Sequence, residues 1–126
     1  YGGPLDRIGM LWGDSMRSCR LVVDTGLHAL GWSRQRAIDF VAANSPMAVG
    51  QIEAEIDRYI GMPAQALSYM LGRIEVQRLR AEAEQTMGGG FDIKGFHDVV
   101  LGSGVVPLDT LGRLVGEWAA DGPTPF

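Results

Sequence analysis

The stretch SMRSCRLVVDTGLHALG, residues 15–31, decides the fold. Its side chains form three rows at spacings of three and four residues, as on an α-helix. One row is apolar, one is small and one is ionisable: Met16, Cys19, Val23, Leu27 and Leu30; Ser18, Val22, Gly26 and Ala29; Arg17, Arg20, Asp24 and His28. Two of these rows favour burial, so we expect a helix over 15–30 that is packed on two sides. Asp14 is its expected N-cap, and Gly31 is the expected residue beyond its C-terminus.

The rest of the sequence also predicts helices and shows no alternation typical of a strand. A short helical segment over 5–12 is expected to end at Gly13. Further helices are expected over 34–43, 46–60, 63–87, 93–101 and 107–120, with breaks at Gly, Ser and Pro. Ser33 and Asp92 are the expected caps of two of them, and the run of glycines over 88–90 is the expected flexible point.

These elements predict an all-α fold, an irregular array of about six helices and not an up-and-down bundle. The length of 126 residues suits one domain, so we expect a single helical domain over 1–126 with flexible ends at 1–4 and 121–126. The start Tyr1-Gly2-Gly3-Pro4 has neither an initiator Met nor a signal-peptide pattern, so we expect the chain to begin within a longer protein.

Composition argues against several classes of function. The net charge is −4 and no basic patch stands out, which argues against a nucleic-acid partner. No apolar run approaches the roughly 20 residues of a membrane span. The single cysteine, Cys19, excludes an internal disulfide and lies in an apolar row, where a thiol is normally inert. The cytoplasm is the favoured compartment of the parent protein, and export is the alternative.

The ionisable row of the helix over 15–30 has two interpretations. It is either a solvated face or a polar row that faces a cleft. In the second interpretation, Asp24 fixes the tautomer of His28, which offers its other ring nitrogen to a ligand. The row of small residues favours the second interpretation, because a helix packed on two sides is seldom peripheral.

A second polar cluster spans the break near residues 61–63. It consists of Arg58, Tyr59, Gln65 and Tyr69. Gln65 and Tyr69 lie one turn apart at the start of a long helix, where the helix dipole favours anions. Arg58 offers a two-pronged donor for a carboxylate, and the tyrosines offer hydroxyl groups. The alternative is a set of helix-end polar residues with the tyrosines in the core.

The sequence lacks a complete catalytic apparatus. Zinc catalysis needs three protein ligands, whereas His28 and His97 lie far apart and neither belongs to a His-Glu-x-x-His motif. His97 is interpreted as a cap or packing residue, and the acidic residues of the third helix, Glu53, Glu55 and Asp57, as solvated. No Gly-x-Ser-x-Gly motif is present. We therefore expect no metal site within this chain.

Several strings of the chain resemble the C-terminal region of the bacterial domain-of-unknown-function 885 (DUF885) family. They occur in order over about residues 5–118: RLVVDTGLHALGWS (20–33), RAID (36–39), EIDRYI (55–60), PAQA (63–66), Tyr69 with Gly72, FDI (91–93), FHD (96–98) and VPL (106–108). The chain departs from the family at Ala64, where Gly usually stands between Pro and Gln. This departure puts the fine placement of Gln65 in question.

The resemblance implies a C-terminal portion of a larger helical zinc metallopeptidase fold of the gluzincin type, some of whose members act as carboxypeptidases or dipeptidases. The zinc-binding residues of the family lie upstream of this region, so zinc is expected in the full-length protein and no cofactor in this chain. The implied catalytic oxyanion donors are His28, steered by Asp24, and Tyr59 or Tyr69. Arg58 and Gln65 are implied to hold a substrate carboxylate or backbone, and Arg20 is expected to pair with Asp24.

Two hypotheses about function follow. In the first, the chain is the substrate-binding part of a zinc peptidase, inactive without its N-terminal zinc-bearing portion, and its ligand is a peptide. In the second, it is a stand-alone, non-catalytic helical module that binds a peptide or a protein. A chain severed from its natural neighbour would also expose an apolar face, through which a homodimer is expected.

Overall fold

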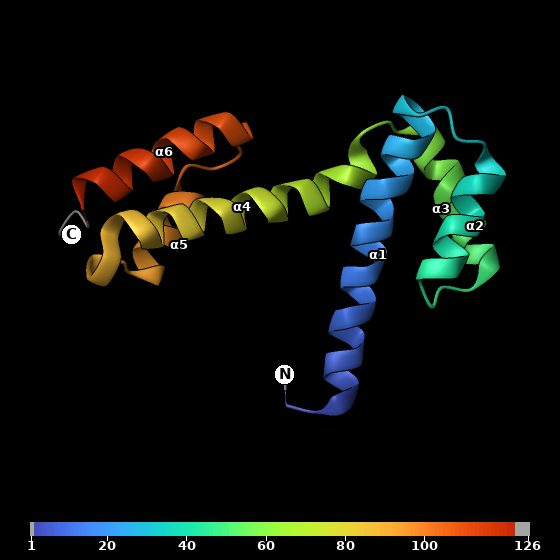
Figure 1. The fold of residues 1–126 in the computed structure, drawn as a ribbon, viewed down its shortest axis with the longest axis horizontal. Coiled ribbons are helices and arrows are strands. Elements are labelled where there is room, and N and C mark those ends of the chain that lie inside the picture. The colour runs from blue at the N-terminus through green and yellow to red at the C-terminus, as the bar shows by residue number, and fades with distance from the viewer. Residues whose placement is uncertain (1, 123–126) are drawn as a thin grey trace. The chain divides into compact units, whose positions relative to one another are not determined.

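The computed structural model describes residues 2–122 and is all-α (Figure 1), as the sequence predicts. The elements in chain order are α1 (Pro4–Ala29), α2 (Arg34–Asn44), α3 (Val49–Gly61), α4 (Gln65–Met87), the short 3-10 helix η1 (Gly88–Gly90), α5 (Ile93–Gly102) and α6 (Leu108–Asp121). The helices divide into two compact units. The first holds the described residues up to Leu71, and the second holds those from Gly72 on, so the boundary falls within α4.

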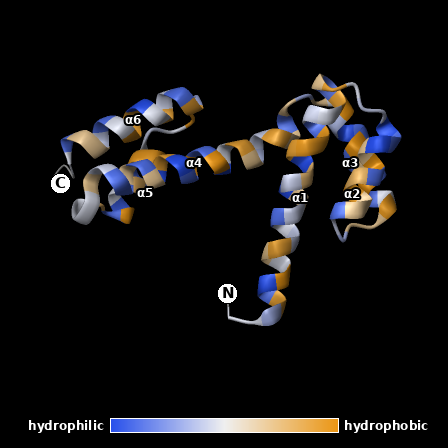
Figure 2. Ribbon diagram, viewed as in Figure 1, coloured by the Kyte–Doolittle hydropathy of each residue, from blue (hydrophilic) through white to orange (hydrophobic). Residues whose placement is uncertain are grey.

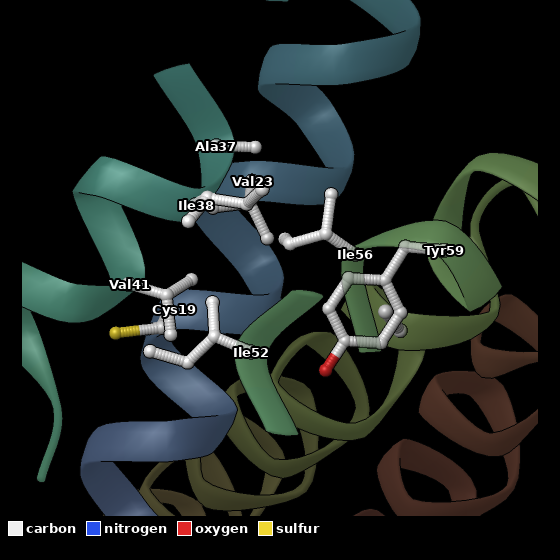
Figure 3. Packing of buried hydrophobic residues seen from close by; sticks show 9 residues of the cluster. Cys19, Val23, Ala37, Ile38, Val41, Ile52, Ile56 and Tyr59 are labelled. Atoms are coloured by element: carbon white, nitrogen blue, oxygen red, sulfur yellow. The ribbon is translucent and has the colours of Figure 1, made fainter. Parts of the chain in front are cut away.

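The first unit packs α2 and α3 beside the C-terminal half of α1 (Figure 1). Its core takes apolar side chains from all three helices and from the first turn of α4 (Figure 3). The buried residues are Cys19, Val23, Ala37, Ile38, Val41, Ile52, Ile56, Tyr59 and Ala66. The apolar row predicted for residues 15–30 therefore supplies this core at Cys19 and Val23, whereas Leu30 is exposed.

Helix α1 is continuous, and the predicted break at Gly13 is wrong. A glycine inside a helix costs only about 1 kcal/mol, which the neighbouring turns offset. The helix begins at Pro4, whose fixed φ suits the first helical position. The Asp6 carboxylate accepts hydrogen bonds from the amides of Gly2 and Gly3. Of the end predicted to be flexible, Pro4 belongs to α1, and Tyr1 lies outside the described residues.

The C-terminus of α1 is closed by a tight turn, as predicted at Gly31, which has a φ of +66°. The amide of Trp32 donates to the carbonyl of Gly26 at 2.8 Å. The Trp32 ring then covers Gly26 so closely that a Cβ there would lie 2.5 Å from the ring. Of the small row, only Gly26 is buried, so the expected close approach of a second helix along that row is wrong.

Helix α2 begins as predicted, because the Ser33 hydroxyl accepts a hydrogen bond from the Arg36 amide. Helix α3 begins three residues later than predicted, at Val49. Residues 46–48 are outside any helix, and Met47 packs from them against the core of the first unit. The Ser45 hydroxyl accepts from the Met47 amide, so it stabilises this turn and does not cap a helix.

The second unit combines the later turns of α4 with α5 and α6 around a separate core. Its buried residues are Leu79, Ala83, Phe96, Leu111, Val115 and Ala119. Asp92 caps α5 as predicted, because its carboxylate accepts from the amides of Lys94 and Gly95. The glycines over 88–90 form one turn of 3-10 helix. Asp121 still belongs to α6, and residues 123–126 lie outside the described part of the chain.

The helices carry both apolar and polar residues along most of their length (Figure 2). Within residues 2–122, no helix is long and apolar enough to cross a membrane.

Candidate functional site

The first unit brings all seven predicted site residues into one connected cluster. They come from the C-terminal half of α1, the end of α3 and the start of α4: Arg20, Asp24, His28, Arg58, Tyr59, Gln65 and Tyr69. Arg17, the fourth member of the ionisable row, is exposed. Asp24 of this row is buried and Arg20 is half-buried, whereas His28 is exposed although its ring contacts the end of α3. The row is therefore solvated only in part.

Asp24 is the buried charge at the centre of the cluster, with only 1% of its surface exposed. Its carboxylate accepts three backbone hydrogen bonds, from the amides of Ala64 (3.0 Å), Ala66 (3.1 Å) and Leu67 (3.2 Å). These amides have no partner within α4, because they belong to its N-terminus. Asp24 therefore caps α4 from another helix, and it is itself the anion that the helix dipole attracts.

Ala64 adopts a left-handed conformation with a φ of +67° immediately before α4. Glycine adopts such a φ without steric cost, whereas a residue with a Cβ is strained there. This is the position at which the sequence departs from a usual glycine. Gln65, the next residue, lies within hydrogen-bond distance of Arg20 and Arg58.

His28 is oriented by a backbone carbonyl and not by Asp24. Its Nε2 lies 3.0 Å from the carbonyl oxygen of Tyr59, whereas the nearest Asp24 oxygen is 3.8 Å away. A carbonyl only accepts, so Nε2 carries the hydrogen and Nδ1 of the neutral ring is an acceptor. His28 would therefore donate from Nδ1 to an oxyanion only as an imidazolium. The backbone carbonyl of Tyr59 therefore fixes this tautomer, in place of Asp24, the residue predicted for this role.

The two candidate tyrosines lie in different environments. Tyr59 is 3% exposed, and its hydroxyl donates to Glu55 at 2.7 Å. Burial, and then this hydrogen bond, raise the pKa of Tyr59 well above its usual range, so the hydroxyl stays protonated. Tyr69 is 48% exposed, and its hydroxyl oxygen accepts from the Gln65 amide at 3.2 Å. The Tyr69 hydroxyl therefore keeps its own hydrogen for another acceptor.

Glu55 is a member of the cluster that sequence reasoning missed. Both of its oxygens accept from the Arg58 guanidinium, at 3.1 and 2.6 Å, and this pairing lowers the pKa of Glu55. The spacing of three residues from Arg58 could have identified the pair. Asp57 is exposed, as predicted, and forms a surface pair with Arg34 of α2, with an Nη2–Oδ2 distance of 2.9 Å.

Arg20 donates to no carboxylate among the described residues and lacks a full set of hydrogen bonds. Its positive charge nevertheless contributes, after Arg58, to the lowered pKa of Glu55. The expected pair with Asp24 is wrong, because the Asp24 oxygens accept from the α4 amides. One Nη of Arg20 donates to Gln65 at 3.4 Å, and Nε is buried with no partner among the described residues. The guanidinium lies over the Tyr69 ring at 4.5 Å and the Tyr59 ring at 5.5 Å.

An open hollow of about 340 Å³ adjoins the cluster at Glu55. Its other lining residues are mostly apolar and come from α1, α3 and the segment between α2 and α3: Trp12, Met16, Met47, Gln51 and Ala54. Met16, Arg20 and Glu55 also line one small enclosed cavity, so the hollow and the Arg20 side chain are neighbours.

Within residues 2–122, no three His, Cys, Asp or Glu side chains are grouped so that they could hold a metal ion. His97 lies in the second unit, is exposed, and has its ring 6.1 Å from the Phe96 ring. It therefore lies outside the cluster.

Comparison with known proteins identifies a family but no characterised relative. A family model described as "Bacterial protein of unknown function (DUF885)" matches residues 1–115. The solved structure of "the putative lipoprotein from Colwellia psychrerythraea" is similar to this chain with a TM-score of 0.88 and 42% sequence identity. The match covers 91% of this chain and 20% of that one, so the chain spans about a fifth of that protein. No curated protein matches the chain.

Proposed function

The chain belongs to the DUF885 family of bacterial proteins, and on this premise we propose that it is the substrate-binding part of a zinc-dependent peptidase of the carboxypeptidase or dipeptidase type. The observation that carries the proposal is the convergence of two guanidinium groups on one amide oxygen. Arg58 and Arg20 both donate to Oε1 of Gln65, at 3.1 and 3.4 Å. Guanidinium groups are well suited to bind the carboxylate or carbonyl oxygens of a peptide.

The residues of the cluster do not fit a zinc site. Asp24 accepts from three amides, Glu55 accepts from Arg58, and Nε2 of His28 is directed to a carbonyl. We therefore assign no step of catalysis to a metal held here. In this proposal the metal is bound by a part of the full-length protein outside this chain.

Within the cluster, Tyr69 is the favoured donor to a substrate carbonyl or oxyanion. Its hydroxyl is accessible, and the Gln65 amide fixes the direction of its free hydrogen. Tyr59 is a positioning residue in this proposal, because its hydroxyl is engaged with Glu55, which in turn holds Arg58.

The proposal is tested by the full-length protein and its Tyr69→Phe variant. The wild type should hydrolyse short peptides and hold stoichiometric zinc. The variant should keep the zinc and lose about 10–100-fold in kcat/KM, because one donor to the developing charge is removed. Ser68→Ala, at the exposed neighbouring position, serves as the control and should change neither quantity. Unchanged kcat/KM in Tyr69→Phe would remove this residue from the site.

A second candidate function is a non-catalytic helical module that binds a peptide or protein. The observation that favours it is an apolar face on the first half of α1, where Leu5, Ile8 and Leu11 are 81, 61 and 60% exposed. Such a face also suits a homodimer. Sedimentation of the 126-residue chain as a clean monomer, with no binding of an apolar dye, would count against both the binding module and the homodimer.

The compartment of the parent protein is also part of the proposal. The similar solved protein is described as a lipoprotein, and this similarity favours an exported parent over a cytoplasmic one. Fractionation of cells that express the full-length protein tests this point, since recovery in the cytosol alone would contradict export.

A further inference from the structure

We propose that Arg20 binds the C-terminal carboxylate of a peptide, with Gln65 holding its place in the absence of ligand. This inference rests on the proposed function and deepens it, because it names the ligand chemistry and the residue that recognises it. It starts from the guanidinium of the cluster that donates to no carboxylate among the described residues.

The other charges of the cluster are already matched. Arg58 forms two hydrogen bonds with Glu55, and Asp24 accepts three from the N-terminus of α4. Arg20 has only the neutral oxygen of Gln65, at the long distance of 3.4 Å, and its buried Nε has no partner within the described chain. A buried donor left unpaired is unfavourable, so an added acceptor at this point would be stabilising.

Arg20 is also held in place for a ligand. Its guanidinium lies over the rings of Tyr59 and Tyr69, at 5.5 and 4.5 Å from their centroids. A planar cation restrained by aromatic rings loses little conformational entropy when it binds. The exposed ring of Tyr69 leaves this side of the cluster open to solvent.

The Gln65 oxygen marks where a ligand oxygen would bind. It accepts from both Arg20 and Arg58, as a bridging carboxylate oxygen would. A carboxylate that displaced it would replace neutral acceptors by charged ones, which form stronger hydrogen bonds. The free hydroxyl hydrogen of Tyr69 is available to the same ligand, because its oxygen accepts from the Gln65 amide.

The charge of the cluster fits a monoanion. Arg20 and Arg58 carry two positive charges, and Glu55 and Asp24 carry two negative ones. The Asp24 oxygens accept from the backbone amides of α4, so the charged groups around the Gln65 oxygen are the two guanidiniums and the Glu55 carboxylate, which pairs with Arg58. A dianion such as phosphate would be repelled by the Glu55 carboxylate, and Arg58 would not offset the second negative charge because it already pairs with Glu55. The neighbouring hollow lined by Trp12, Met16 and Met47 suits an apolar side chain on the residue that carries the carboxylate.

The test measures binding to the full-length protein by calorimetry. The probe is acetyl-Ala-Leu in which the Ala–Leu peptide bond is reduced to CH2–NH, so that it cannot be hydrolysed. Two forms of this probe are compared, one with a free C-terminal carboxylate and one with a C-terminal amide. The wild type should bind the acid about 10–100-fold more tightly than the amide. Arg20→Gln should reduce this ratio to about 3-fold or less, and Arg20→Lys should restore part of it, because lysine keeps the charge but loses the fork.

Arg17→Gln is the matched control, since Arg17 is an exposed arginine one turn earlier on α1, and it should keep the wild-type ratio. Circular dichroism of each variant shows whether it is still folded, so that loss of binding is distinguished from loss of fold. The preference of the wild type for the acid over the amide is a test that depends on no variant. The inference is overturned if the wild type binds both probes equally, if Arg20→Gln keeps the preference, or if that variant weakens both probes equally.

The same experiment separates the inference from the proposed function. Selective binding of the acid through Arg20, without hydrolysis of the natural acetyl-Ala-Leu peptide, would support the carboxylate site and contradict the peptidase. Peptide hydrolysis with no preference for a free carboxylate would support the peptidase and overturn the role of Arg20.

Discussion

At the scale of single residues, Asp24 explains how a charge is accommodated in the core of the first unit. Its oxygens accept hydrogen bonds from amides at the N-terminus of α4, which lie 40 or more residues away in the sequence. Three amide hydrogen bonds meet the hydrogen-bonding requirement of a carboxylate that is almost wholly buried. Asp24 thus joins α1 to α4 and places Gln65 beside Arg20 and Arg58.

Ala64 offers a direct test of this junction. Its φ of +67° is strained for a residue with a Cβ, so Ala64→Gly should raise the free energy of unfolding by about 1 kcal/mol. Urea denaturation followed by circular dichroism measures the change. Ala54→Gly in the exposed part of α3 is the control and should lower stability by about 1 kcal/mol, because glycine is a poor helix former. A loss of stability in Ala64→Gly would show that the left-handed turn is not adopted.

Sequence reasoning identified the members of the cluster other than Glu55, but not their pairings. Spacing of three and four residues brought Arg20, Asp24 and His28 to one side of α1, which the structure confirms. Spacing cannot show that the amides of Ala64 and Leu67 approach Asp24, because a capping contact from a separate helix depends on tertiary packing. For that reason the expected Arg20–Asp24 pair was wrong.

At the scale of helices, α1 and α2 are joined by the contact between Gly26 and Trp32. The Trp32 ring occupies the space above Gly26, and a Cβ at that position would lie 2.5 Å from a ring atom. Gly26→Ala should therefore lower the free energy of unfolding by about 1–3 kcal/mol, since the aromatic ring and the turn after α1 must shift. Thermal or urea denaturation measures the loss.

Gly50→Ala in α3 is the matched control for that substitution. No atom lies within 4 Å of a Cβ built there, so alanine should be neutral or stabilise by up to about 1 kcal/mol. Equal effects of the two substitutions would mean that Trp32 does not cover Gly26.

Helix ends were predictable where the residue that caps them is local. Ser33, Gly31 and Asp92 act as expected, because each contacts its own helix end within a few residues. The break expected at Gly13 and the helix start expected at Pro46 were wrong, since glycine only weakens a helix and a proline suits extended chain as well as a first helical turn.

At the scale of the whole molecule, the all-α class followed from helical periodicity, which dominates the chain. The division into two units, each with its own core, was not predicted. Periodicity shows that a helix has an apolar face but not which other helix covers it. In α4, Ala66 packs in the first core and Leu79 and Ala83 in the second, so one helix serves both.

The central claim is that this chain binds substrate while another part of the full-length protein holds the metal. The most direct measurement is the zinc content and peptide hydrolysis of the full-length protein beside those of the 126-residue chain. The account predicts stoichiometric zinc and hydrolysis of short peptides for the full-length protein, and neither for the chain alone. Tight zinc binding or hydrolysis by the chain alone, or an inactive full-length protein without zinc, would contradict it.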